Sequence, residues 1–199
     1  FLTHPGKNIY LWPVWFFTSY AQVTGNQSVE KTVATLQGQG KFTDPDVVAA
    51  LDNVFAFGKE GLFINGVNSL DTDGATATFL TGKAAGWLSS NGVIKTVRDA
   101  NPPNFTLDVN LAPTMPTSKG ESQFPGGTGS ALSIYKKIDG TRKDLAFKYL
   151  DFLTSDKNVE WLVQQTKGAV ATNTNAKPSD DPVALKFSGL VEKMTIYLD

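Results

Sequence analysis

A short polar run, Ser89-Ser90-Asn91, offers hydroxyl and amide groups directly after an apolar segment. That segment, residues 79–88, begins with a phenylalanine at the end of a helical pattern, turns at Gly82-Lys83 and continues through two alanines. Small residues after a turn allow a strand to enter a packed sheet, and open α/β sheets bind ligands beyond the carboxyl ends of their strands. The three polar side chains are therefore candidate ligand contacts that donate and accept hydrogen bonds.

The composition excludes several other kinds of chemistry. The 199 residues contain no cysteine, which removes disulfides and thiolate metal sites, and a single histidine, His4, which excludes a multi-histidine metal site. The 18 basic and 19 acidic residues are dispersed and give a net charge of −1, so no polybasic patch is available for nucleic acid. We expect no catalytic residues, no metal and no cofactor.

Helical patterns and short apolar runs alternate along the chain, which indicates an α/β fold. Residues 9–12 predict a strand that leads through a proline into a helix over residues 14–23. The polar stretch 27–42, with its glycines, predicts an irregular excursion with at most one short strand. A Thr-Asp-Pro helix start and apolar residues at helical spacing then predict a helix from residue 45 to about 58.

The second half continues the alternation. The alternating residues 106–111 predict a half-buried strand, and residues 130–135 predict another. Further helices are predicted at residues 71–79, 92–100, 145–153, 159–163 and 181–198. The chain begins at Phe1 without a signal peptide and ends inside a helical pattern, so we expect it to be a piece of a longer protein.

Six motifs resemble, in order, those of the extracellular solute-binding proteins that deliver sugars to ABC importers, the maltodextrin-binding-protein-like family. The most characteristic, F-x-x-G-K-A-A, is matched by Phe79 and Gly82-Lys83-Ala84-Ala85. The remaining matches are Trp12, Trp15, Phe16 and Gly25; Phe42, Asp44, Pro45, Val47 and Ala50-Leu51; Pro113, Pro116, Gly126-Gly127 and Leu132; Ala146, Tyr149-Leu150, Phe152-Leu153 and Thr154-Ser155; and Gly168 with Ala171.

The resemblance implies a fold, an arrangement of lobes and a cellular role. It covers the carboxyl-terminal part of such a receptor and implies a periplasmic-binding-protein-like fold, with most of one lobe and part of the second, truncated at both ends. Residues 1–112 and 156–199 would form the main lobe, and residues 113–155 would belong to the other. The implied location is the periplasm or, through a lipid anchor, the surface of a bacterium. The implied partners are a sugar or oligosaccharide, the membrane subunits of an ABC permease and the missing amino-terminal lobe.

A sugar presents an apolar face and a ring of hydroxyl groups, so its receptor needs aromatic planes and fixed polar groups in a preformed cleft. Trp12, Trp15 and Phe16 supply planes where a strand is predicted to end and a helix to begin. The alternative is that these rings only pack the core, as buried aromatics usually do. Trp87, inside an apolar segment, is interpreted as a core residue.

Two further groups complete the predicted site. Ser89, Ser90 and Asn91 are interpreted as contacts to ligand hydroxyls, although Ser90 or Asn91 would equally serve to cap the next helix. Gly126, Gly127 and Thr128 are interpreted as a turn whose N–H groups meet the ligand, because glycine allows a close backbone approach. The alternative for this turn is a flexible entry into the following strand.

The sequence leaves three functional hypotheses. The first is a non-enzymatic carbohydrate receptor of an ABC importer. The second is a carbohydrate-active enzyme or its accessory module, which would need two carboxylates set across a glycosidic bond. No such pair stands out among the acidic residues. The third is a receptor for a non-sugar ligand such as a phosphate ester or a polyamine.

Overall fold

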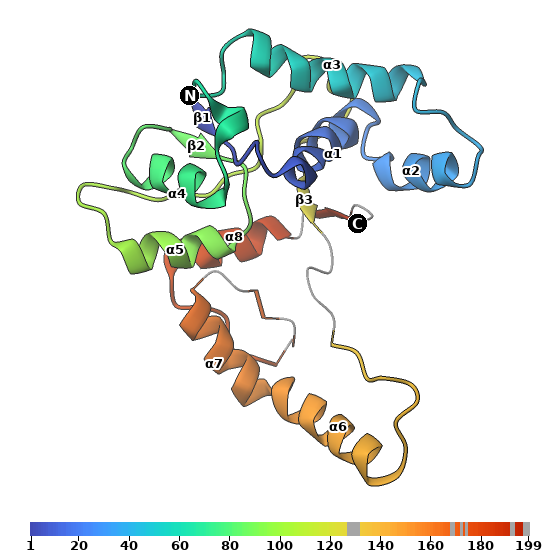
Figure 1. Ribbon diagram of the computed structural model, residues 1–199, viewed down its shortest axis with the longest axis vertical. Coiled ribbons are helices and arrows are strands. Elements are labelled where there is room, and N and C mark those ends of the chain that lie inside the picture. The colour runs from blue at the N-terminus through green and yellow to red at the C-terminus, as the bar shows by residue number, and fades with distance from the viewer. Residues whose placement is uncertain (127–131, 168–169, 172, 174, 192–193, 197–199) are drawn as a thin grey trace.

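The computed structural model describes residues 1–126, 132–167, 170–171, 173, 175–191 and 194–196. Within them the chain forms α-helices α1 to α8, two single turns of 3₁₀ helix and two small parallel sheets (Figure 1). The predicted α/β class is confirmed, with helix predominating. No helix in the described part of the chain is both long enough and apolar enough to cross a bilayer.

Both sheets join segments that lie far apart in the sequence. Strand β1 (Leu2–Thr3) pairs with β2 (Gly86–Trp87), with Leu2 opposite Gly86, and β3 (Phe124–Gly126) pairs with β4 (Met194–Ile196). A Cβ atom on Gly86 would lie only 2.7 Å from Cδ2 of Leu2. Glycine therefore permits the close approach of β2 to β1.

The amino-terminal part of the body is built around helix α1 (Trp12–Val23), which packs against α3 (Pro45–Lys59) (Figure 1). Tyr20 and Val23 of α1 form a buried cluster with Val47 and Ala50 of α3. Helix α2 (Ser28–Leu36) lies against α1, and the 3₁₀ turns η1 (Ile9–Leu11) and η2 (Val67–Ser69) connect elements nearby. This cluster fixes the position of α1.

A second cluster brings together α4 (Thr72–Leu80), α5 (Gly92–Ala100) and α8 (Pro182–Val191). Its buried residues include Phe79, Ile94 and Phe187, one from each helix. The Asp71 carboxylate accepts a hydrogen bond from the Gly74 N–H at 2.9 Å and so caps α4. These contacts hold β2 and α5 against α8, which begins about 90 residues after α5 in the sequence.

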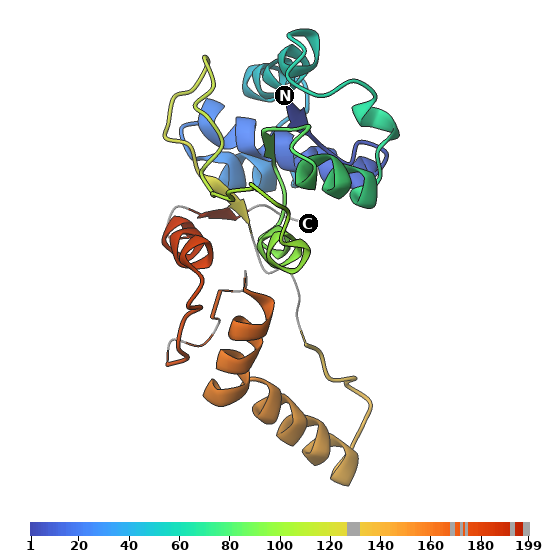
Figure 2. The same ribbon diagram turned by 90° about the vertical axis from the view of Figure 1, so that its left-hand side faces the viewer.

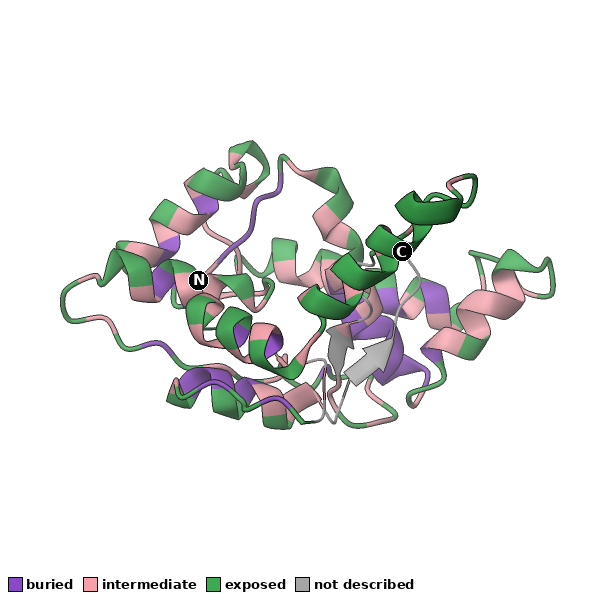
Figure 3. Ribbon diagram, turned by 90° about the horizontal axis from the view of Figure 1, so that it is seen from below, coloured by how far each residue is buried: buried purple, intermediate pink, exposed green. Residues whose placement is uncertain are grey.

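Helices α6 (Gly140–Leu153) and α7 (Asp156–Thr166) extend away from the body, as Figures 1 and 2 show. No residue of α6 is buried, and the helix is coloured almost wholly as exposed in Figure 3. Leu145, Tyr149 and Phe152 are all well exposed. In α7, by contrast, Val159 and Val163 pack against Ala176. The division into residues 1–112, 113–155 and 156–199 stays a prediction.

Two predictions for the first half of the chain were wrong. Residues 9–11 form η1 rather than a strand, and Ile9 and Tyr10 are 78% and 71% exposed, so no sheet buries them. The stretch 27–42 contains helix α2 rather than an irregular segment. Its glycines, Gly38 and Gly40, come only after the helix, and Gly38 has a positive φ of 80° that suits the turn ending it.

Other differences concern the second half. Residues 106–111 alternate in burial, with Leu107 buried and Asp108 exposed, yet no strand is formed there, because alternation specifies faces and not a hydrogen-bonding partner. The helix predicted over residues 181–198 ends at Val191, and β4 follows. Of the strand predicted at 130–135, residues 130–131 lie outside the described residues and residues 132–135 form no strand.

Candidate functional site

A cavity of about 270 Å³ opens between the β2–α5 connection, residues 107–112 and helix α8. Apolar side chains from the second core cluster form part of its wall, among them Phe79, Ile94 and Phe187. Polar residues also line it, including Ser89, Asn110 and Gln123. An apolar wall with a few polar groups is the usual character of a small-molecule site.

The structure brings one predicted group of site residues to this cavity. Ser89, Ser90 and Asn91 follow β2 and all line it. Asn91 is the N-cap residue of α5, but its side chain makes no capping hydrogen bond. The capping alternative for Asn91 therefore lacks the hydrogen bond that would define it.

One carboxylate lies at the cavity, and an ion pair engages it. Both oxygens of Asp108 lie 2.8 Å from the Nζ of Lys186 on α8, and the same Nζ is 3.0 Å from Oδ1 of Asn110. Hydrogen bonding to Lys186, supported by the Val109 N–H, holds the pKa of Asp108 below its usual range. Among the described residues that line the cavity, Asp108 is the only carboxylate.

The predicted aromatic residues lie elsewhere, and none of Trp12, Trp15 and Phe16 belongs to the described lining of the cavity. Trp15 is only 3% exposed, and its Nε1–H donates to Nδ1 of His4 at 3.2 Å. Trp12 is half-buried and donates from Nε1 to the Gly6 carbonyl at 3.2 Å. Phe16 stacks on Tyr20 with ring centroids 5.2 Å apart.

His4 lies inside this aromatic cluster and is 1% exposed. Its ring centroid is 4.4 Å from that of Trp12 and 6.4 Å from that of Phe63. Because Nδ1 accepts a hydrogen bond from Trp15, the proton of the neutral ring is assigned to Nε2. Burial lowers the pKa of His4 to about 4, so the ring is neutral at physiological pH.

The third predicted group is only partly described. Gly126 ends strand β3, is half-buried and is not part of the described cavity lining. Gly127 and Thr128 lie outside the described residues. The prediction that these three residues form a ligand-binding turn remains a prediction.

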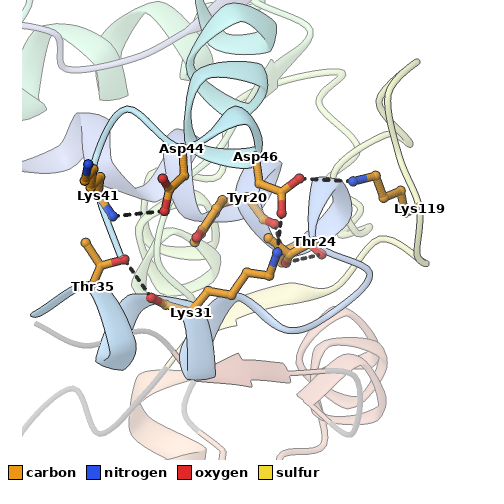
Figure 4. A network of polar contacts seen from close by, with 9 residues as sticks. Tyr20, Thr24, Lys31, Thr35, Lys41, Asp44, Asp46 and Lys119 are labelled. Carbon is orange, nitrogen blue, oxygen red and sulfur yellow. Dashed lines mark hydrogen bonds and ion pairs between the residues drawn. The ribbon is translucent and has the colours of Figure 1, made fainter. Parts of the chain in front are cut away.

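The loop over residues 113–122 is bound to the body. Lys31 and Lys119 both pair with Asp46 at the start of α3, the latter at 3.0 Å (Figure 4). The hydrogen bond from Lys31 is the main cause that lowers the pKa of Asp46. In the same loop Met115 is 3% exposed. The Lys119–Asp46 ion pair and the burial of Met115 thus attach the loop to the body at α3, and the Lys31–Asp46 pair joins α2 to α3.

Sequence reasoning did not select several residues that line the cavity: Asp108, Asn110, Gln123 and Phe187. A signal for the first two exists, because they are the polar positions of the alternating segment 106–111. No local pattern marks Gln123. The described residues contain no group of three or more histidine, cysteine or acidic side chains arranged to hold a metal ion.

The chain matches the model of a known protein family. The family described as bacterial extracellular solute-binding protein matches residues 2–186 of the chain. Comparison with curated proteins and with solved structures found no significant match.

Proposed function

The chain belongs to the bacterial extracellular solute-binding proteins, and from this premise we propose that it binds a sugar or oligosaccharide for an ABC importer. Members of this family act as substrate-binding receptors for membrane transporters and are in general not enzymes. In more detail, we propose that the carbohydrate is held in a cleft between two lobes. We also propose that the protein is located in the periplasm or is attached to the cell surface by a lipid anchor.

The observation that carries the proposal is the cavity beyond β2. Ser89, Ser90 and Asn91 offer hydroxyl and amide groups on one wall, and Asn110 and Gln123 offer amides on others. Neutral donors and acceptors beside apolar surface suit a ligand with many hydroxyl groups. The proposal that Trp12, Trp15 and Phe16 contact the ligand rests on the sequence motif, because none of them belongs to the described lining of this cavity.

The carboxylate at the cavity argues against the alternative of a glycoside hydrolase. Hydrolysis requires two carboxyl groups, one of which has a raised pKa so that it can donate a proton. Asp108 stands alone among the described lining residues, and its pKa is lowered by Lys186. A non-sugar receptor remains an alternative without an observation that favours it.

Calorimetric titration of the chain with maltotriose and a panel of other sugars tests the proposal. We expect binding of at least one sugar, and no release of chromophore from nitrophenyl glycosides. Replacing Asn91 with alanine should weaken that binding. Glycoside hydrolysis, or the absence of binding to any sugar in the panel, would contradict the proposal.

A further inference from the structure

Gln22 is 0% exposed, although glutamine is rarely buried so completely. Its side chain directs both polar groups at one distant loop. Oε1 accepts the Met115 N–H at 2.7 Å, and Nε2 donates to the Pro113 carbonyl at 3.2 Å. The backbone carbonyl of Gln22 adds a hydrogen bond from the Lys119 N–H at 2.8 Å. One residue of α1 therefore engages both the outgoing and the returning arm of the loop at residues 113–122.

The same loop begins and ends at the cavity. Ala112 precedes the loop and Gln123 follows it, and both residues line the cavity wall. Ser122 closes the base of the loop, because its Oγ donates to the Ala112 carbonyl and lies 3.5 Å from Nε2 of Gln22. A change in the loop stem consequently moves two residues of the wall.

The side-chain contacts at the tip of the loop are separate from those of the Gln22 side chain. Nδ2 of Asn53 donates to Oγ1 of Thr117 at 2.8 Å, and the Nζ of Lys119 pairs with Asp46 across an exposed surface. The tip contacts attach the loop to α3, whereas Gln22 contacts the arms nearest the cavity. This separation supplies a matched control.

We propose that Gln22 is a positioning residue for the cavity: it clips the two arms of the loop together and so fixes Ala112 and Gln123 in the wall. The role in ligand binding rests on the proposed function, whereas the positioning of the wall does not. The hydrogen bonds of a buried amide mainly offset the cost of removing the amide from water, so they add little to the stability of the fold. Because all the partners of the Gln22 side chain are backbone or hydroxyl groups of one loop, the main effect of these bonds is to hold that loop in one geometry.

The first test uses Gln22→Met, which keeps the length of the side chain and removes its hydrogen bonds. Controls are Lys119→Met, which removes only the ion pair at the tip, and Val163→Ala, which truncates a buried residue of α7 remote from the loop. In protein labelled at alanine methyl groups, the Ala112 signal should shift or broaden in Gln22→Met alone. Ala85, which lines the cavity from the β2 side, serves as an internal reference. An unchanged Ala112 signal in folded Gln22→Met would overturn the inference.

The second test is calorimetry with maltotriose, carried out well below the unfolding temperature of every variant. Gln22→Met should bind about five- to tenfold more weakly than the unaltered chain, as expected for a lost hydrogen-bonded clip. Lys119→Met and Val163→Ala should bind normally. An equal loss of affinity in Val163→Ala would show that the weaker binding comes only from reduced stability, and it would reject the positioning role. If the unaltered chain binds no sugar, the proposed function fails, and the Ala112 signal alone decides the role of Gln22.

Discussion

Acid should destabilise this protein through His4 before it affects any carboxylate noticeably. The chain has one histidine, so His4 is the only imidazole whose protonation could lower the stability between pH 7 and pH 4.5. Burial among Trp12, Trp15 and Phe63 lowers its pKa from 6.5 to about 4 in the folded protein. The unfolded chain therefore binds a proton at pH values where the folded chain does not.

The sign and size follow from linkage. Stability is complete above about pH 6.5, falls as the pH decreases towards about 4, and levels off below that value. The two pKa values differ by about 2.5, and each pH unit is worth about 1.4 kcal/mol, which gives a limit of about 3 kcal/mol. Between pH 7 and pH 4.5 we expect a loss of about 2 kcal/mol. Protonation also removes Nδ1 as the acceptor for Trp15, so the tryptophan fluorescence of the folded protein should change with a midpoint near pH 4.

Urea denaturation at half-unit pH steps measures the free energy of unfolding over this range. The matched variant is His4→Asn, whose Oδ1 can accept the Trp15 N–H but whose side chain does not titrate. Its stability should be nearly independent of pH down to about 4.5. The carboxylates Asp46 and Asp181, with pKa values lowered from 3.8, lose their contribution only at more acidic pH. A slope that persists unchanged in His4→Asn would refute the assignment.

Three further predictions concern the core, the loop and the ligand. Phe79→Ala should lower the free energy of unfolding by about 3–5 kcal/mol in a denaturant titration, as a truncation of the second cluster; a loss below about 1 kcal/mol would contradict this placement of the core. Gly120→Ala should cost about 1–3 kcal/mol, because the added Cβ would lie 3.0 Å from the Gly25 Cα, and a neutral result by the same method would show that the loop is loose. Trp12→Ala should weaken sugar binding by about 1–3 kcal/mol in calorimetry if the ring stacks on the ligand, and equal binding would leave Trp12 to its contacts with His4 and Gly6.

Local sequence chemistry predicted most helices correctly because their signals lie within a few residues. Asp71 caps α4 through the Gly74 N–H, and Asn101 ends α5 in the left-handed conformation. Such positions follow from the backbone requirements of a helix end. The same reasoning failed at residues 9–11, where an apolar run formed an exposed 3₁₀ turn. Whether an apolar run becomes a strand depends on a partner that the local sequence does not specify.

The residues of the candidate site also fall into two groups: those that local sequence signals and those that only tertiary packing brings to the cavity. Ser89, Ser90 and Asn91 were predicted because a turn, a strand and a helix start lie in one continuous segment. The opposite walls come from residues 107–112, Gln123 and α8, and their approach depends on tertiary packing. Gln22 belongs to the same category, since its partner Met115 is 93 residues away. A polar residue in an aromatic helix gives a weak hint of a buried hydrogen bond, but no indication of its partner.

Helix α1 links these observations, because it carries Trp15 towards His4 and Gln22 towards the loop. Positions 15 and 22 are seven residues apart on one helix, a rise of about 10 Å, and the described hydrogen bonds of the two side chains share no partner. Substitutions at such a separation usually add within about 0.5 kcal/mol. We therefore expect His4→Asn and Gln22→Met to change the free energy of unfolding additively at pH 7. The pH dependence should vanish in His4→Asn and persist in Gln22→Met. A coupling above about 1 kcal/mol in this double-mutant cycle would mean that α1 shifts as a rigid body, and that the aromatic cluster and the cavity wall move together.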